Sequence, residues 1–414
     1  MKIGILTYHA ACNFGANLQA LSTISYWRNC GHEPVFINWV TRQLEERYRH
    51  NTPSIQFSEH EAFRKQFFPM TIRCYSTSDI AKVVEKEEIK AIIVGSDAVL
   101  QTRPLRSRLL KPTFDHPLPF TFPPKDNVAP NPFWGSFYSK LKHPIPICLM
   151  SASSQNSPYQ TLNRFEKRIQ RDLLLQFSYI STRDDWTSKM VSYITDGYVN
   201  PTITPDPVFA FNYNVKKQPS ELEIRKKFHL PERYSLVCFH KRCPVSIEWL
   251  MDLKKEQSKQ GVDCIAFPFP QGIEFKHPFD YAIDLPLSPL DWYALIKYAD
   301  SYIGDNMHPI VISLHNAVPC YSFDHYGCSQ DETSSKIYHI MNRFGVLKNH
   351  IAFRFNYTQP TVEHVLGCIK GFDKVHVRAC AEEYLGEYLQ MMTNITQTIT
   401  KYKYENPESV KKNV

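Results

Sequence analysis

The sequence predicts an α/β protein with two doubly wound domains that face each other across a cleft. Short apolar runs, typical of buried parallel strands, alternate with segments of helical periodicity along most of the 414 residues. A charged segment that contains prolines, over 206–232, separates a first set of these elements from a second. Two successive sets of strands and helices therefore predict two parallel sheets, each covered by helices on both faces.

The first set opens with a strand over 2–8, a turn over 9–14 and a helix over 15–29, which Gly31 is placed to end. Its remaining elements are expected, in chain order, as strand 34–39, helix 80–90, strand 91–94, strand 145–150, helix 162–175, strand 179–182 and helix 186–193. Residues 103–146 hold ten prolines and show little periodicity. We expect them to form a long surface insertion that contributes to a substrate lid.

The second set is expected as strand 234–239, helix 246–261, strand 263–268, helix 289–299, strand 301–304, helix 309–315 and strand 318–323. A long helical pattern follows over 377–400, and we expect this helix to cross back onto the first domain. The predicted organisation is an N-terminal domain (1–210), a linker (211–232), a C-terminal domain (233–375), the crossing helix (376–405) and a disordered tail (406–414).

Two Rossmann-like domains in series bring the carboxyl ends of their strands, and hence their ligand-binding loops, to a shared crevice. This arrangement is the GT-B architecture, which occurs in enzymes that use nucleotide sugars or other anionic donors. The fold alone does not assign the reaction.

The composition and charge of the chain exclude some classes of function. Hydrophobic residues make up 43% and charged residues 21% of the chain, as in ordinary globular proteins. The formal charge of +7 fits an anionic substrate or peripheral contact with the inner membrane, while the absence of a basic run excludes a nucleic-acid-binding arm. The eleven cysteines lack paired ligand spacing, so we expect free thiols in the cytoplasm and no metal. We find no signal peptide and no apolar segment long enough to span a bilayer.

Polar residues follow two strands of the first set, where ligand-binding side chains are expected. The turn Asn13-Phe14-Gly15 lets the backbone approach a ligand at a helix N-terminus, and Asn13 can equally serve as the helix cap. Asp97 ends a Gly-Ser-Asp turn after a strand. It can act as a base or bind a sugar hydroxyl, and the alternative is an Asx turn.

Arg183 also follows a buried strand, and its planar guanidinium suits bidentate binding of a carboxylate or phosphate. The alternative for Arg183 is an ion pair with Asp184 or Asp185.

In the second set, the segment from Gly304 to Pro309 joins a strand to an apolar helix and contains Asp305, Asn306 and His308. Pro309 suits the first helical position, which places His308 at the helix start, where the dipole lowers an imidazole pKa and favours anions. The alternative is a buried structural histidine. Lys241 and Lys336 are weaker candidates for contact with an anion, and either can be an ordinary solvated charge.

Five segments together resemble the polysaccharide pyruvyl transferase family. They are, in order, KIGILTYHAACNFGANLQAL, IIVGSDAVLQ, SYISTRDDWT, ITPDPVF and YIGDNMHPIVISLHNAVPCYSFD, and they run from residue 3 to about 325. The resemblance implies transfer of an enolpyruvyl unit from phosphoenolpyruvate to a sugar of an exopolysaccharide, capsule or cell-wall precursor, as a pyruvate ketal. No cofactor or metal is implied, and the glycosyl acceptor is free or lipid-linked.

The resemblance also implies roles for individual residues. It gives Arg183 as an anchor for the donor and His308 as a donor contact and general acid or base. It gives Asp97 as a polar group near the acceptor, with Asn13 and Gly15 on the first domain's side of the cleft. The first domain would bind the acceptor and the second the donor.

The sequence departs from the family pattern at two informative positions. Asn306 stands where many members have arginine, and Ala98 stands where glutamine is usual. Lys336, Lys241 or Arg242 can replace the missing cation, or the donor can differ. Two alternatives therefore stay open: a GT-B glycosyltransferase that uses a nucleotide sugar, and a catalytically degenerate member that only binds its ligand.

Overall fold

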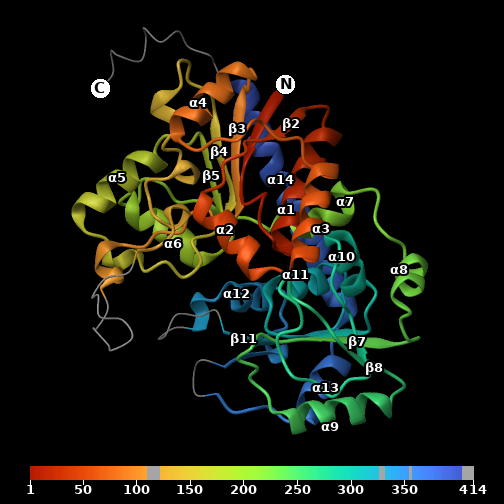
Figure 1. Cartoon of the computed structure of the whole chain (residues 1–414). Coiled ribbons are helices and arrows are strands. Elements are labelled where there is room, and N and C mark those ends of the chain that lie inside the picture. Colours follow the sequence, from red (N-terminus) through yellow and green to blue (C-terminus); the bar gives the residue numbers. More distant parts are fainter. Residues whose placement is uncertain (110–121, 326–331, 354–356, 403–414) are drawn as a thin grey trace.

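The fold consists of two parallel six-stranded sheets with helices around them, one above the other in Figure 1. The computed structural model describes residues 1–402 except 110–121, 326–331 and 354–356. The tail predicted over 406–414 lies outside these residues. The predicted fold class is confirmed.

The first sheet has the strand order β2-β1-β3-β4-β5-β6. The strand order therefore reverses between β1 and β3, which pair in parallel from Ile3–Ala91 to Leu6–Val94. The strands are β1 (Lys2–Leu6), β2 (Glu33–Phe36), β3 (Ala91–Asp97), β4 (Ile147–Ala152), β5 (Tyr179–Thr182) and β6 (Thr202–Ile203).

The second sheet has the order β12-β11-β10-β7-β8-β9, and its strand order reverses between β7 and β10. In such sheets ligands bind outside the carboxyl ends of the strands at the point of reversal. The strands are β7 (Tyr234–Cys238), β8 (Asp263–Ala266), β9 (Tyr281–Ala282), β10 (Ser301–Gly304), β11 (Cys320–Asp324) and β12 (His350–Ala352).

Helices connect and cover the strands of both sheets. Those of the first half are α1 (Phe14–Asn29), α2 (Arg42–Asn51), α3 (Ser54–Phe67), α4 (Thr77–Lys86), α5 (Arg164–Leu174), α6 (Asp185–Ile194), α7 (Phe211–Asn214) and α8 (Glu221–Phe228). Those of the second half are α9 (Ile247–Ser258), α10 (Pro289–Lys297), α11 (Met307–His315), α12 (Lys336–Arg343), α13 (Val362–Lys370) and α14 (Lys374–Lys401). None of these helices combines the length and apolar content needed to cross a membrane.

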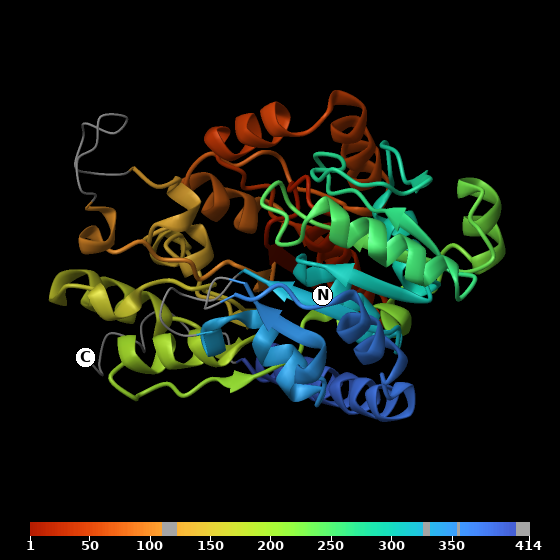
Figure 2. The ribbon, with the colours of Figure 1, turned by 90° about the horizontal axis from the view of Figure 1, so that it is seen from below.

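Each sheet is buried on both faces, because alternate side chains of its strands enter different cores. In β7, Leu236 packs into a core that both domains share, whereas Val237 packs toward α9 and α13. Seen from below, α9 lies across the second sheet (Figure 2). The shared core joins α1 to α10, where Phe14 stacks on Trp292 with ring centroids 5.0 Å apart. The two sheets are therefore held by one continuous apolar core.

Helix α14 returns to the first domain, as predicted. It contacts α11 of the second domain and β5 of the first, where Ser181 Oγ lies 3.4 Å from Met391 Sδ. The ring of Tyr388 packs edge-on against Tyr26 of α1.

Several elements differ from the prediction for physical reasons. The helix α2 buries only Leu44, so it has almost no apolar periodicity to detect. The strands β6 and β9 have two residues each, too few to show an alternating pattern. The expected linker contains α7 and α8. Helix α11 begins at Met307, two residues before the expected start, because a proline at the third position loses no intrahelical hydrogen bond.

The proline-rich insertion is built from short 3₁₀ turns in the part of it that the structure describes. Trp134 is fully buried, and its indole N–H donates to the backbone oxygen of Gln101 at 3.3 Å. This side chain anchors the insertion to the first domain. The described cysteines are free thiols.

Candidate functional site

A polar cavity of about 360 Å³ lies between the domains, at the points where the strand orders reverse. The first domain contributes Tyr8 after β1 and Asp97 at the end of β3, and the second contributes Asn306, Met307 and His308 after β10. The rest of its lining is Ala11, Asn13, Ala16, Arg47, Tyr48, Ala98, Gln101, Arg103, Asp126, Asn127, Gln155 and Lys336. We refer to it as the interdomain cavity.

His308 reaches across the domain boundary to Gly15. A Cβ atom built on Gly15 would lie 2.1 Å from Cγ of the imidazole, so only glycine fits against this ring. The close approach fixes the position of His308 relative to helix α1. From the sequence we expect the backbone at Gly15 to lie close to a ligand. In the structure it lies close to the ring of His308 in the other domain.

The His308 imidazole is neutral at physiological pH. Burial lowers its pKa most, and the nearby charges of Lys336 and Arg183 lower it further; Asp206 and Asp97 oppose this, leaving a pKa of about 4. The Nε2 atom is buried without a hydrogen-bond partner among the described residues. A neutral imidazole with an unused ring nitrogen can accept a proton from a bound hydroxyl.

Arg183 lies behind the cavity rather than in its lining. Its side chain is 2% exposed, and Nη1 donates to Oδ2 of Asp206 at 2.6 Å. A second nitrogen, Nη2, lies 3.9 Å from Oδ1 of Asp97. The alternative partners expected from sequence, Asp184 and Asp185, are not the ones used: Asp184 caps α6 and accepts from Thr187. Arg183 is thus placed to hold Asp97.

Asp97 occupies the carboxyl end of β3 in the left-handed region, with φ of 82°. Its Oδ1 accepts the backbone N–H of Ala98 at 2.8 Å, and its side chain remains 19% exposed at the cavity. A non-glycine residue in this conformation is uncommon and is often found at functional sites.

Three cations line the same cavity. Lys336 opens α12, and its pKa is lowered to about 8, mainly by burial and then by the charge of Arg183. Arg47 comes from α2 and Arg103 from the start of the proline-rich insertion. Sequence reasoning names Lys336 but misses both arginines, because Arg47 lies on a polar helix that buries only Leu44 and Arg103 opens a segment with little periodicity.

A smaller cavity of about 190 Å³ adjoins the first and shares Asn13, Asn306 and His308 with it. Asn13 also caps α1, where its Oδ1 accepts the Ala16 N–H at 3.0 Å, so both expected roles are compatible. Phe14, Gly15 and His240 line this cavity too. We refer to it as the small cavity.

Asp305 is fully buried beside the small cavity and bonds to His240. Its Oδ2 accepts the backbone N–H of His240 at 3.1 Å, and its Oδ1 lies 3.0 Å from His240 Nδ1. Asp305 therefore lies behind the wall of the small cavity, and His240, which precedes Lys241 in the sequence, forms part of that wall. Lys241 is exposed and lines neither cavity.

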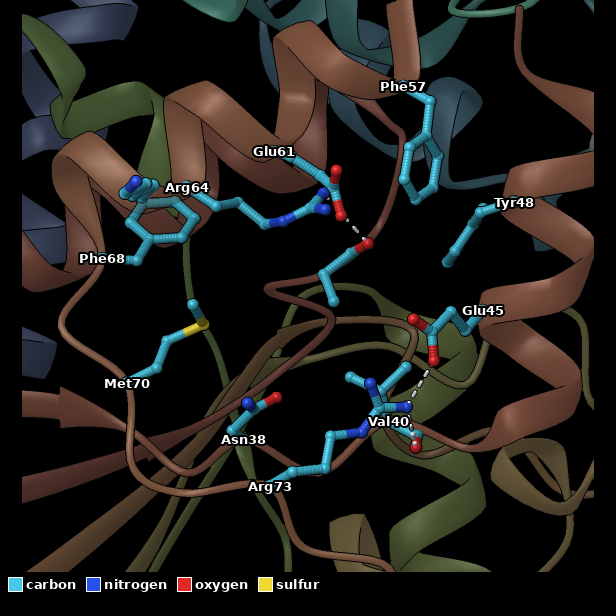
Figure 3. A pocket seen from close by; sticks show the side chains of 12 residues that line it. Asn38, Val40, Glu45, Tyr48, Phe57, Glu61, Arg64, Phe68, Met70 and Arg73 are labelled. Atoms are coloured by element: carbon cyan, nitrogen blue, oxygen red, sulfur yellow. Dashed lines mark hydrogen bonds and ion pairs between the residues drawn. The ribbon is translucent and has the colours of Figure 1, made fainter. Parts of the chain in front are cut away.

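A third cavity, of about 580 Å³, lies in the first domain between α2, α3 and the loops after β2 (Figure 3). Tyr48 lines both this cavity and the interdomain cavity, so the two adjoin. Phe57, Phe68 and Tyr48 form aromatic walls, with charged groups between them; Arg73 bonds to Glu45 at 2.6 Å. We refer to it as the aromatic cavity, and no motif in the sequence points to it.

A family model for polysaccharide pyruvyl transferase matches residues 13–326 of this chain. The chain belongs to the polysaccharide pyruvyl transferase family. The match includes every residue of the interdomain cavity except Tyr8, Ala11 and Lys336. No curated protein sequence matches this family member significantly.

Solved structures similar to this family member share its fold at low identity. A putative UDP-N-acetylglucosamine 2-epimerase from Listeria monocytogenes has a TM-score of 0.54 at 8% identity, with 98% of each chain covered. UDP-GlcNAc 2-epimerase from Neisseria meningitidis, bound to UDP-GlcNAc, has a TM-score of 0.53 at 9% identity, with 97% of this chain and 100% of that chain covered. The enzyme from Methanocaldococcus jannaschii has a TM-score of 0.51 at 11% identity, with 95% and 100% covered. These likenesses show the two-domain fold.

The contact between Gly15 and His308 predicts a specific non-additive effect on stability. Gly15→Ala should lower the free energy of unfolding by about 1–3 kcal/mol, because the new methyl group overpacks the imidazole. Adding His308→Ala removes the ring and should recover most of this loss in a double-mutant cycle measured by denaturant unfolding. Gly386→Ala is the control, because a Cβ there meets nothing within 4 Å. Additive single effects would contradict the contact.

Proposed function

We propose that this family member transfers the pyruvyl group of phosphoenolpyruvate to a sugar and forms a pyruvate ketal. The observation that carries the proposal is the pairing, in one interdomain cavity, of a neutral His308 with the cations Lys336, Arg47 and Arg103. Phosphoenolpyruvate carries a carboxylate and a phosphate, so it needs cationic partners beside a group that can move protons. Family membership supports the same reaction.

The charges suggest how the donor lies. Lys336 and the N-terminus of α11 are close to His308 and suit the phosphate, while Arg47 and Arg103 suit the carboxylate. Lys336 thus takes the place of the arginine that many relatives have at position 306. Arg183 acts as a positioning residue, because it holds Asp97 from behind the cavity.

The steps then follow from the protonation states. A proton is added to the methylene carbon of the donor, and the acid is Lys336, with a pKa of about 8, or Asp126, whose pKa burial raises. A sugar hydroxyl attacks C2 and gives its proton to neutral His308. A second hydroxyl then displaces the phosphate at C2 and closes the ketal, and its proton leaves on the departing phosphate. Asp97 accepts a hydrogen bond from the acceptor.

The aromatic cavity is the proposed place for the acceptor. Aromatic faces beside charged hydrogen-bonding groups suit sugar rings, which have apolar faces and polar edges. Its junction with the interdomain cavity at Tyr48 would let one sugar reach the donor while its neighbours in a glycan occupy the larger space.

Incubation with phosphoenolpyruvate and a panel of glycosyl acceptors tests the reaction. We expect phosphate release matched by the mass gain of a pyruvate ketal on one acceptor, and a fall in kcat of about 10²–10⁴-fold in His308→Gln. Release of UDP from UDP-N-acetylglucosamine would instead favour a nucleotide-sugar reaction, of which the structural neighbours give examples. Tight donor binding without turnover on any acceptor would favour the degenerate alternative.

Donor binding should weaken as the pH rises through about 8, because Lys336 loses its proton there. Titration calorimetry with phosphoenolpyruvate at pH 6.5–9.5 measures this, and Lys336→Ala should raise Kd by about tenfold or more at pH 7. Lys336→Arg keeps its charge throughout and should remove the pH dependence. An unchanged high-pH limb in Lys336→Arg would exclude Lys336 as the titrating group.

The two substrates should respond to different substitutions. Glu61 is exposed and lines the aromatic cavity alone, so Glu61→Ala should raise the KM of the acceptor by about 10–100-fold and leave the KM of the donor unchanged. Glu46→Ala, on the neighbouring helix and outside all three cavities, is the matched control. A larger effect on the donor would place the acceptor elsewhere.

A further inference from the structure

Three potential metal ligands meet at the carboxyl edge of the second sheet. His240 follows β7, Asp305 follows β10 and His325 follows β11, and these are three neighbouring strands. One ligand atom from each lies within 4.8 Å of the other two. We propose that His240, Asp305 and His325 bind a divalent transition metal of the Zn²⁺ class. This inference does not depend on the proposed transfer reaction.

The spacing is close to that of a metal site. Ligand atoms about 2.1 Å from a tetrahedral Zn²⁺ are about 3.4 Å apart. His240 Nδ1 and Asp305 Oδ1 are already 3.0 Å apart, and the imidazole rings of His240 and His325 have centroids 5.2 Å apart. Small side-chain rotations would complete the geometry, and water would fill the fourth position.

The surroundings hold the ligands in place, as metal sites require. Asp305 is fully buried, and the backbone N–H of His240 fixes its second oxygen. The ring of His240 packs on Phe269 with centroids 4.0 Å apart, and that of His325 packs near Phe353 at 5.7 Å. A buried carboxylate with two imidazoles that pack near aromatic rings is a donor set that suits Zn²⁺ rather than Mg²⁺ or Ca²⁺.

The same sheet offers a comparison. His350 of β12 bonds to Asp324 at the end of β11, with Nε2 and Oδ2 3.0 Å apart. Among the described residues, His350 and Asp324 have no third potential ligand close enough to complete a metal site. His240, Asp305 and His325 form a group of three. A buried histidine–aspartate pair contains only one imidazole. The second imidazole of this cluster, that of His325, is the feature that points to a metal.

A metal here would bind beside the small cavity. His240 lines that cavity together with His308, so the ion would fix the His240 ring and tie together the strand ends at the reversal point. The positive charge would also lie near Asn306, which lines the same cavity as His240.

The test uses the intact chain after dialysis against a chelator. We expect uptake of one Zn²⁺ per chain by mass spectrometry of the metal, a rise in Tm on adding Zn²⁺, and a tetrahedral absorption spectrum with Co²⁺ that lacks a thiolate charge-transfer band. His325→Ala should weaken Zn²⁺ binding by more than the roughly 10–100-fold that loss of a merely supporting residue causes, and His240→Ala should do the same.

Two controls make the result decisive. Cys368 and Cys380 each lie near a histidine one helical turn away, so the experiment is also run in a Cys368→Ala/Cys380→Ala background, where uptake should persist. His350→Ala removes an imidazole from the neighbouring pair and should leave Zn²⁺ affinity unchanged. The proposal is overturned if the intact chain takes up no metal, if uptake disappears with the two thiols, or if His325→Ala binds Zn²⁺ as tightly as the unaltered chain.

Discussion

The site depends on one contact, the packing of the His308 ring against Gly15. It joins the N-terminal end of α11 in the second domain to that of α1 in the first, and it leaves no room for a side chain at Gly15. His308 lines both the interdomain cavity and the small cavity, and Gly15 lines the small cavity. Because His308 lines both cavities and packs on Gly15, the shape of both cavities depends on how the two domains pack together.

The pKa values of His308 and Lys336 follow mainly from burial around this contact. Asp97 and Asp206 are held by the buried Arg183, and these charges act on His308 together with Lys336. Desolvation is the largest of these effects. The imidazole of His308 is therefore neutral, and the pKa of Lys336 is lowered to about 8. A neutral imidazole therefore lies beside three cations in the interdomain cavity, and the proposed transfer rests on this combination.

The sequence predicts the fold better than the site. Strands such as β1, β3, β7 and β10 are short apolar runs followed by turn residues, and this signal needs no tertiary information. The same signal points to His308, Asp97 and Asn13, which all line the interdomain cavity, because residues that follow strands lie at the carboxyl edge of a sheet. The polar helix α2 has no such signal.

The remaining site residues depend on long-range packing. Arg47 and Arg103 reach the cavity from a polar helix and a proline-rich insertion, and the ion pair of Arg183 with Asp206 joins residues 23 positions apart. The same limit explains why Lys241 is expected at the site while its neighbour His240 forms the cavity wall. Both residues lie in the loop after β7, where no strand alternation indicates which of two adjacent side chains faces the cavity.

A crystal structure with phosphoenolpyruvate bound would show directly whether the interdomain cavity holds the donor. This placement predicts that the anionic groups of the donor lie against Lys336, Arg47 and Arg103 and that its C2 atom lies beside the His308 ring. Density for the donor in the aromatic cavity, or in a place that neither His308 nor Lys336 touches, would contradict it.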